Sequence, residues 1–204
     1  MNIKKPLGKQ ALKSYSVNSE TAIEEIQWSL YDFEAYANAG QSVLTFFQSP
    51  VGANGKTLED TNMDTAGQIP KGMNMLVEAL AVEFFPGVAS ASATLSDLAD
   101  DVREVYEGGF LDFKVGSKKY KTEGPLGVYP PQWGVDVRAT TGLAAGNVTS
   151  ARCIGDIHTI IPVRLTSNQN FSVSLNWPTP RALPSGVDGR IGVRLIGRMF
   201  RNSQ

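Results

Sequence analysis

The chain has 204 residues, and 42% of them are hydrophobic, which is enough to bury the core of one domain or at most two small ones. Its formal net charge of −1 excludes a global attraction to nucleic acid or to an anionic membrane. The single cysteine, Cys153, excludes an intrachain disulfide and a thiolate-rich zinc site, so we expect it to pack as a small hydrophobe.

Charged residues make up 19% of the chain, below the roughly 25% that is usual for soluble domains. Because charge is depleted at interfaces, a large assembly surface is one explanation, and compositional scatter is the other. No apolar run reaches the ~18 residues that cross a bilayer. The N-terminus has lysines but no apolar block after them, so we expect no secretory signal and a protein that matures in a reducing cytoplasm.

Residues 1–20 are predicted to form an extended, polar N-terminal arm. It has no acidic residue before Glu20, and its positive charges are Lys4, Lys5, Lys9 and Lys13. Such an arm is either a solvated tail or a segment that reaches a neighbouring subunit or an anionic surface.

Residues 20–40 carry two periodicities. Apolar residues recur at helical spacing as far as Ala37, yet Tyr31, Phe33 and Ala35 alternate with acidic residues as in a half-buried strand. Residues 38–41 (NAGQ) then resemble a turn into 42–50, which is rich in β-forming residues. We favour a β-hairpin over 30–49.

A long polar loop rich in Gly, Asn and Asp follows at 51–72. Residues 73–85 are apolar at both odd and even positions, which predicts a strand in the middle of a sandwich that ends at Pro86-Gly87.

A capped helix is predicted at about 94–107. Thr94 with Asp97 resembles a capping box, an apolar stripe recurs at helical spacing, and Gly108-Gly109 ends it. Residues 111–115 then alternate as a strand, Gly116-Ser117 forms a tight turn, and KKYK begins the return strand. Prolines from 125 to 131 oppose further regular pairing.

The last quarter of the chain has the clearest pattern. Residues 171–177 and 190–199 each alternate apolar and polar residues, with a long crossover between them. Several short strands and one helix predict an all-β protein, a single jelly-roll β-sandwich over residues 21–204 that follows the arm.

Three arginines, Arg190, Arg194 and Arg198, fall on one face of the last strand. Our first interpretation is that this stripe forms salt bridges to a neighbouring subunit, and our second is contact with an enclosed genome. No aromatic residues alternate with the arginines to stack on bases.

Catalytic and metal-binding motifs are missing from the sequence. His158 is the only histidine, and although Asp156 would share its strand face, no Ser or Cys motif accompanies the pair. Asp60, Asn62 and Asp64 resemble the start of a calcium loop but lack its glycine and glutamate, so Asx turns explain them better. Asp100 and Asp101 are interpreted as a solvated helix face. We expect no enzyme activity, no cofactor and no metal.

Residues 44–87 and 108–131 resemble capsid proteins of small tailless icosahedral bacteriophages, a group known mostly from environmental sequences, and RIGVRLIGRMFR at 190–201 is a weaker match. The resemblance implies a jelly-roll shell subunit without catalysis. Many such phages with an internal membrane use longer, double jelly-roll subunits, whereas 204 residues accommodate one roll.

The resemblance predicts a structural capsid protein that forms an icosahedral homo-oligomer in the virion after assembly in the host cytoplasm. Its partners would be copies of itself, other capsid proteins, and an enclosed nucleic acid or internal membrane, with no small-molecule substrate. The helix and hairpin at 94–123 would then either project for docking to neighbours or plug one end of the sandwich.

Two other functions stay open at the level of the sequence. A carbohydrate- or receptor-binding sandwich would need an aromatic platform from Trp28, Trp133 and Trp177, although Trp177 is in phase with core residues. A small hydrolase or isomerase would need His158 in a cleft beside carboxylates.

Overall fold

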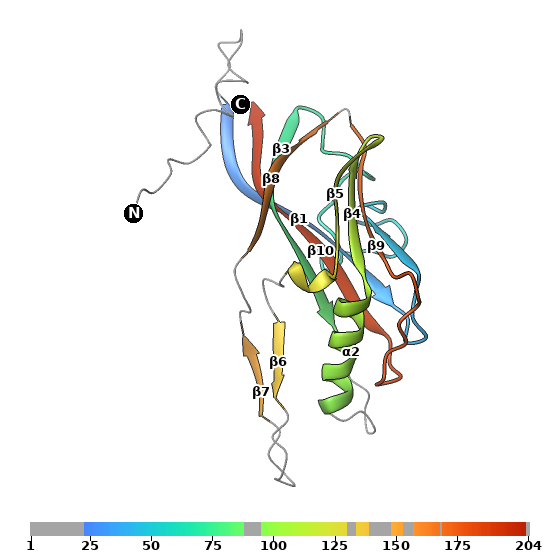
Figure 1. The fold of residues 1–204 in the computed structure, drawn as a ribbon. Helices are drawn as coiled ribbons and strands as arrows, with labels where there is room; N and C mark the ends of the chain where they lie inside the picture. Colours follow the sequence, from blue (N-terminus) through green and yellow to red (C-terminus); the bar gives the residue numbers. More distant parts are fainter. Residues whose placement is uncertain are drawn as a thin grey trace.

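Two antiparallel four-stranded sheets face each other across the core in the computed structural model of the protein (Figure 1). The long sheet has the spatial order β1 (Ile23–Tyr36), β10 (Gly189–Asn202), β3 (Met73–Phe85), β8 (His158–Thr166). The short sheet has the order β2 (Val43–Phe46), β9 (Phe171–Asn176), β4 (Phe110–Val115), β5 (Lys118–Glu123). For the part of the chain that the structure describes, the prediction of a mostly β sandwich with one helix is therefore confirmed.

The other elements among the described residues are α2 (Leu95–Gly108), the 3-10 turn η1 (Leu126–Val128) and a separate hairpin of β6 (Gly134–Arg138) with β7 (Val148–Arg152). The structure describes residues 23–87, 95–129, 134–138, 148–152, 157–167 and 169–202. Several residues singled out above lie outside that range: Lys4, Lys5, Lys9, Lys13, Thr94, Trp133, Cys153 and Asp156.

The core lies between the two sheets and follows from the period of two in their strands. Val173 and Leu175 of β9 face Val193 and Leu195 of β10, and all four side chains are fully buried. Trp177, 1% exposed, extends this core toward α2, as its phase with β9 predicted.

The predicted hairpin over 30–49 is wrong, although its strands and its turn exist. β1 pairs with β10 over its whole length, from Ile23 opposite Asn202 to Tyr36 opposite Gly189, whereas β2 pairs with β9 in the other sheet. The turn after Tyr36 therefore carries the chain between sheets. Gly40 permits it, because φ is 86° and an added Cβ would lie 2.7 Å from the backbone of Arg181.

The helix α2 plugs one end of the sandwich (Figure 1). Val105 is fully buried in the core, and the hydroxyl of Tyr106 donates to the carbonyl of Val82 at 2.8 Å. The indole of Trp177 donates to the carbonyl of Val105 at 3.0 Å, which satisfies one of the last four helix carbonyls. The predicted end of the helix at Gly108-Gly109 is confirmed.

Two details of this region differ from the prediction. The β4–β5 hairpin is not a projecting insertion, because β4 pairs with β9 and buries Leu111 and Phe113 in the core. Asp101 is not on a solvated face, since it is fully buried and accepts a hydrogen bond from the backbone N–H of Ser185 at 2.9 Å. The helix face that carries Asp101 therefore packs on the 183–187 loop.

The β6–β7 hairpin was not predicted and extends beyond the sandwich on the side of α2 (Figure 1). The prolines at 125–131 favoured an irregular segment here, although the alternation of residues 134–138 (GVDVR) is typical of a strand and is the sequence signal for β6.

Candidate functional site

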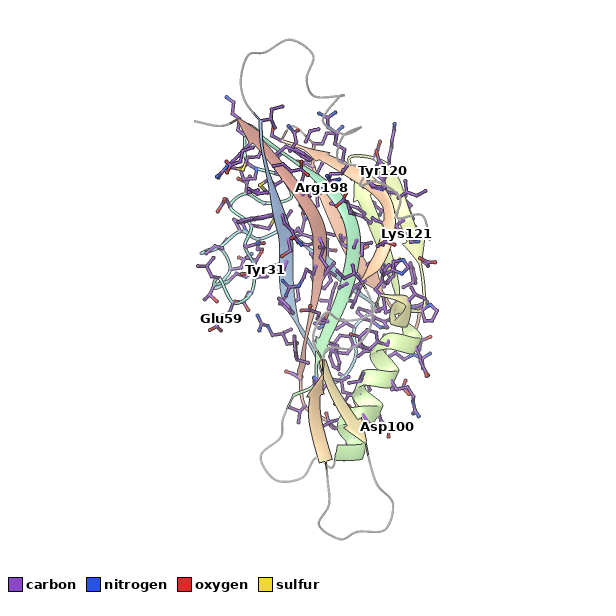
Figure 2. All side chains as sticks on the ribbon, turned by 90° about the vertical axis from the view of Figure 1, so that its left-hand side faces the viewer. Tyr31, Glu59, Asp100, Tyr120, Lys121 and Arg198 are labelled. Atoms are coloured by element: carbon purple, nitrogen blue, oxygen red, sulfur yellow. The ribbon has the colours of Figure 1, made fainter. Side chains whose placement is uncertain are left out.

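The outer face of the long sheet carries the arginine stripe. Ile191, Val193 and Leu195 of β10 point into the core, so the alternating Arg190, Arg194 and Arg198 lie on the opposite face. Figure 2 looks toward this side of the molecule, with Arg198 near its upper end and Tyr31 lower on β1. The predicted common face of the three arginines is confirmed.

Each arginine is paired with a carboxylate of the same chain. Arg190 lies 2.8 Å from Asp60, and Arg194 donates two hydrogen bonds of 3.2 Å to Glu83. Arg198 is held by two carboxylates, at 2.5 Å from Glu78 and 2.6 Å from Glu25. The stripe is thus a ladder of ion pairs rather than a free basic surface. Its contact with a neighbouring subunit or with a genome stays a prediction.

A β-bulge positions one of these carboxylates. The register of β3 shifts against β10, because the adjacent Ile196 and Gly197 face Ala79 and Val77, which leaves Glu78 as the extra residue. The bulge directs Glu78 to Arg198 on the outer face. Opposite it, an alanine Cβ at Gly197 would lie 1.9 Å from the carbonyl oxygen of Leu76, so only glycine fits there.

The ion pairs fix the arginine side chains and their charges. The hydrogen bond to Glu78, reinforced by Glu25, raises the pKa of Arg198. The guanidinium of Arg194 also lies 5.3 Å from the centre of the Tyr31 ring. The ladder is therefore a rigid surface of nearly balanced charge.

Asp60, which pairs with Arg190 at one end of the ladder, has a lowered pKa. Hydrogen bonds from the backbone N–H and the hydroxyl of Thr57, together with the charge of Arg190, lower the pKa of Asp60 below its ordinary value. Asp60 thus ties the 51–62 loop to β10.

A groove with an apolar floor crosses the same face. Two adjoining cavities of about 320 and 550 Å³ share Gln27, Ile157 and Ile196, and we call them together the Ile157 groove. Ile157, which directly precedes the edge strand β8, is 42% exposed, and Ile161 within β8 is 89% exposed. A groove between neutralised ion pairs suits aliphatic side chains better than a charged ligand.

The 51–62 loop protects the free edge of β1. Asn62 accepts a hydrogen bond from the N–H of Tyr31 at 3.0 Å and donates to the carbonyl of Ser29 at 2.8 Å, as a neighbouring strand would. Asp60 and Asn62 therefore have separate structural partners, which supports their interpretation as loop-forming residues. Among the described residues, no cluster of His, Cys, Asp and Glu could hold a metal ion.

A buried ionic cluster, which the sequence pattern did not reveal, holds the same loop. Asp32 is fully buried, and Lys56 Nζ lies 2.6 Å from both Asp32 and Glu34. Burial alone lowers the pKa of Lys56, but the two carboxylates more than offset it, so the pKa lies above its ordinary value. The amine of Lys56 therefore has a structural role, because Asp32, Glu34 and the carbonyl of Phe33 all accept hydrogen bonds or ion pairs from it.

His158 lies beside a carboxylate that sequence reasoning did not name. Its Nε2 is 3.9 Å from Glu123, whose oxygen also accepts a hydrogen bond from the hydroxyl of Tyr129 at 3.2 Å. Lys121, 2.5 Å away, is the main cause that lowers the pKa of Glu123. His158 does not line the Ile157 groove. His158 and Glu123 thus connect the start of β8 with the end of β5, and we interpret this contact as structural.

The tryptophans do not assemble into one flat platform within the part of the chain that the structure describes. Trp177 is buried, and Trp28, 40% exposed, stands on β1.

Comparisons with models of protein families, with curated proteins and with solved structures found no match for this chain. No helix within the described ranges is long and apolar enough to cross a membrane.

Proposed function

We propose that the chain is a single jelly roll that assembles with copies of itself into an icosahedral viral shell. The observation that carries the proposal is the nesting of the strand pairs. If the eight sandwich strands are counted along the chain, the first pairs with the last (β1 with β10) and the second with the seventh (β2 with β9). The third pairs with the sixth (β3 with β8) and the fourth with the fifth (β4 with β5).

Nested antiparallel pairing is what results when one long hairpin of eight strands is wrapped into two sheets, as in the jelly rolls of viral capsids. The resemblance of residues 44–87 and 108–131 to phage capsid proteins supports the same class. The proposed roles are structural: a subunit of the virion, assembled in the host cytoplasm, whose partners are copies of itself and other capsid proteins, without a catalytic step.

The outer face of the long sheet is the surface we assign to contacts between subunits. It combines the Ile157 groove with Ile161, which protrudes from an edge strand, so one subunit offers both a recess and an aliphatic side chain. Rigid, internally neutralised arginines around the groove add little charge repulsion between identical copies.

Negative-stain electron microscopy of the purified protein tests the proposal. We expect particles or rings of defined size, and a clean monomer at high concentration across salt conditions would overturn it. Ile161→Ser tests the surface: it should leave the thermal melting temperature unchanged while it abolishes or reduces particle formation. Leu58→Ser, at a 68% exposed site in the 51–62 loop, is the matched control and should still assemble.

A carbohydrate- or receptor-binding module is the second candidate, and the partial exposure of Trp28 beside the Ile157 groove favours it. A glycan array decides this alternative. Binding that Trp28→Ala abolishes would support it, whereas an array without hits would remove it.

A further inference from the structure

We propose that the β4–β5 hairpin binds single-stranded nucleic acid, with its lysines holding phosphates and Tyr120 stacking on a base. The inference does not depend on shell assembly, because every residue that it uses belongs to one hairpin of one chain. Figure 2 shows Tyr120 and Lys121 on the opposite edge of the molecule from Tyr31 and Glu59.

The charge balance distinguishes this hairpin from the ladder. Lys114 and Lys119 share one carboxylate, Asp112, at 3.5 and 3.0 Å, and Lys121 pairs with Glu123. Lys118 forms no ion pair with the described residues, so the four lysines exceed the two carboxylates by two charges. The arginines of β10, by contrast, are matched by the carboxylates around them. Surplus positive charge for a polyanion therefore lies on the hairpin.

The hairpin also presents an aromatic ring between its lysines. The register of the β4–β5 pair shifts so that Phe113 faces Lys121 and Lys114 faces Lys119, which leaves Tyr120 as the bulge residue without a partner. Its side chain is 49% exposed, and the Phe113 ring lies behind it at 6.5 Å between centroids. An exposed ring flanked by cations is the arrangement on which unpaired bases stack.

Lysines on an edge strand have another established effect, which is to discourage pairing with a foreign strand. That effect needs charge alone and would not use an exposed ring. An anionic membrane surface would use the charges without any preference for bases. Single-stranded nucleic acid is the partner for which both the cations and the ring have a use.

Fluorescence anisotropy with a labelled single-stranded dT20 oligonucleotide tests the proposal on the full chain, across a salt titration. Lys118→Gln/Lys119→Gln should weaken binding and make the slope of log K against log salt less negative by about 1.4, since each phosphate contact on a single strand contributes about 0.7. Tyr120→Ala should weaken dT20 binding at least about fivefold, the lower end for one stacked base, and Tyr120→Phe should restore it.

Three controls make the result decisive. Lys71→Gln, at an exposed lysine of the polar loop, should leave both affinity and slope unchanged. The measurements are repeated with Lys4, Lys5, Lys9 and Lys13 replaced by Gln, so that the arm cannot mask the hairpin. Light scattering confirms that all variants have the same oligomeric size.

Three outcomes would overturn the proposal: hairpin substitutions that behave like Lys71→Gln, an equal effect of Tyr120→Ala on dT20 and on polyphosphate, or lysine-dependent binding to anionic phosphatidylserine vesicles without binding to dT20. Failure of the shell proposal, by contrast, would appear in electron micrographs and leave these affinities as predicted.

Discussion

Replacement of Trp177 by Phe should destabilise the protein by about 2–4 kcal/mol. The ring is 1% exposed, packs edge-on against Tyr36 at 5.1 Å and donates to the carbonyl of Val105. The smaller ring leaves roughly 40 Å³ empty, which costs about 1 kcal/mol at ~24 cal/mol per Å³. Loss of the indole hydrogen bond to the carbonyl of Val105 adds about 1–3 kcal/mol, because phenylalanine cannot replace the donor at this buried position.

Urea denaturation followed by circular dichroism measures the change as a free energy of unfolding. Trp28→Phe is the matched control: the same substitution at a 40% exposed site on β1 should change the free energy of unfolding by less than about 1 kcal/mol. Equal losses from the two substitutions would refute the inference that Trp177 anchors α2. Hydrogen exchange should also show faster opening of α2 in Trp177→Phe than in the wild type.

Three further predictions concern the ion pairs and the bulge. Arg194→Leu should lower the free energy of unfolding by about 2–4 kcal/mol, because it leaves the buried carboxylate of Glu83 unpaired. In a denaturant titration, the double variant with Glu83→Leu should recover most of that loss, and additive losses would contradict this reasoning. The lowered pKa of Asp60 contributes stability that is present above the unfolded pKa near 3.9 and is lost as the pH falls through the folded value. In Asp60→Asn, the melting temperature should therefore fall less steeply between pH 6 and pH 2 than in the wild type. An unchanged profile would count against the ion pair of Asp60 with Arg190. Gly197→Ala should lower the free energy of unfolding by more than about 1 kcal/mol, because the added Cβ meets a backbone carbonyl. Gly127→Ala, with no atom within 4 Å of the added Cβ, should be nearly neutral. Thermal melts of the two variants decide whether the bulge needs glycine.

The sequence was most informative where a single strand or helix explained its own pattern. The period of two in 171–177 and 190–199 predicted both strands and their buried faces, and Trp177 fell in the core as expected. The end of α2 at Gly108 and the tight turn at Gly116, where φ is 58°, likewise follow from local chemistry.

Strand partners could not be predicted in the same way. Alternation shows which face of a strand is buried but not which strand lies beside it, so β1 and β2 were joined as a hairpin although each pairs with a strand from the last quarter of the chain. The carboxylates of the ladder were missed for the same reason, because Glu78 and Glu25 lie 120 and 173 residues from Arg198. Such pairs form only when distant strands are brought together.

The central position of β10 has a consequence for synthesis of the protein. β10 lies between β1 and β3, yet it follows both by more than a hundred residues, so neither can acquire this neighbour until residue 202 has left the ribosome. The N-terminal two-thirds of a nascent chain must therefore wait with unpaired strand edges, a state in which chaperones would be engaged. Since its pairings are so distant along the chain, this sandwich should fold over milliseconds to seconds rather than microseconds.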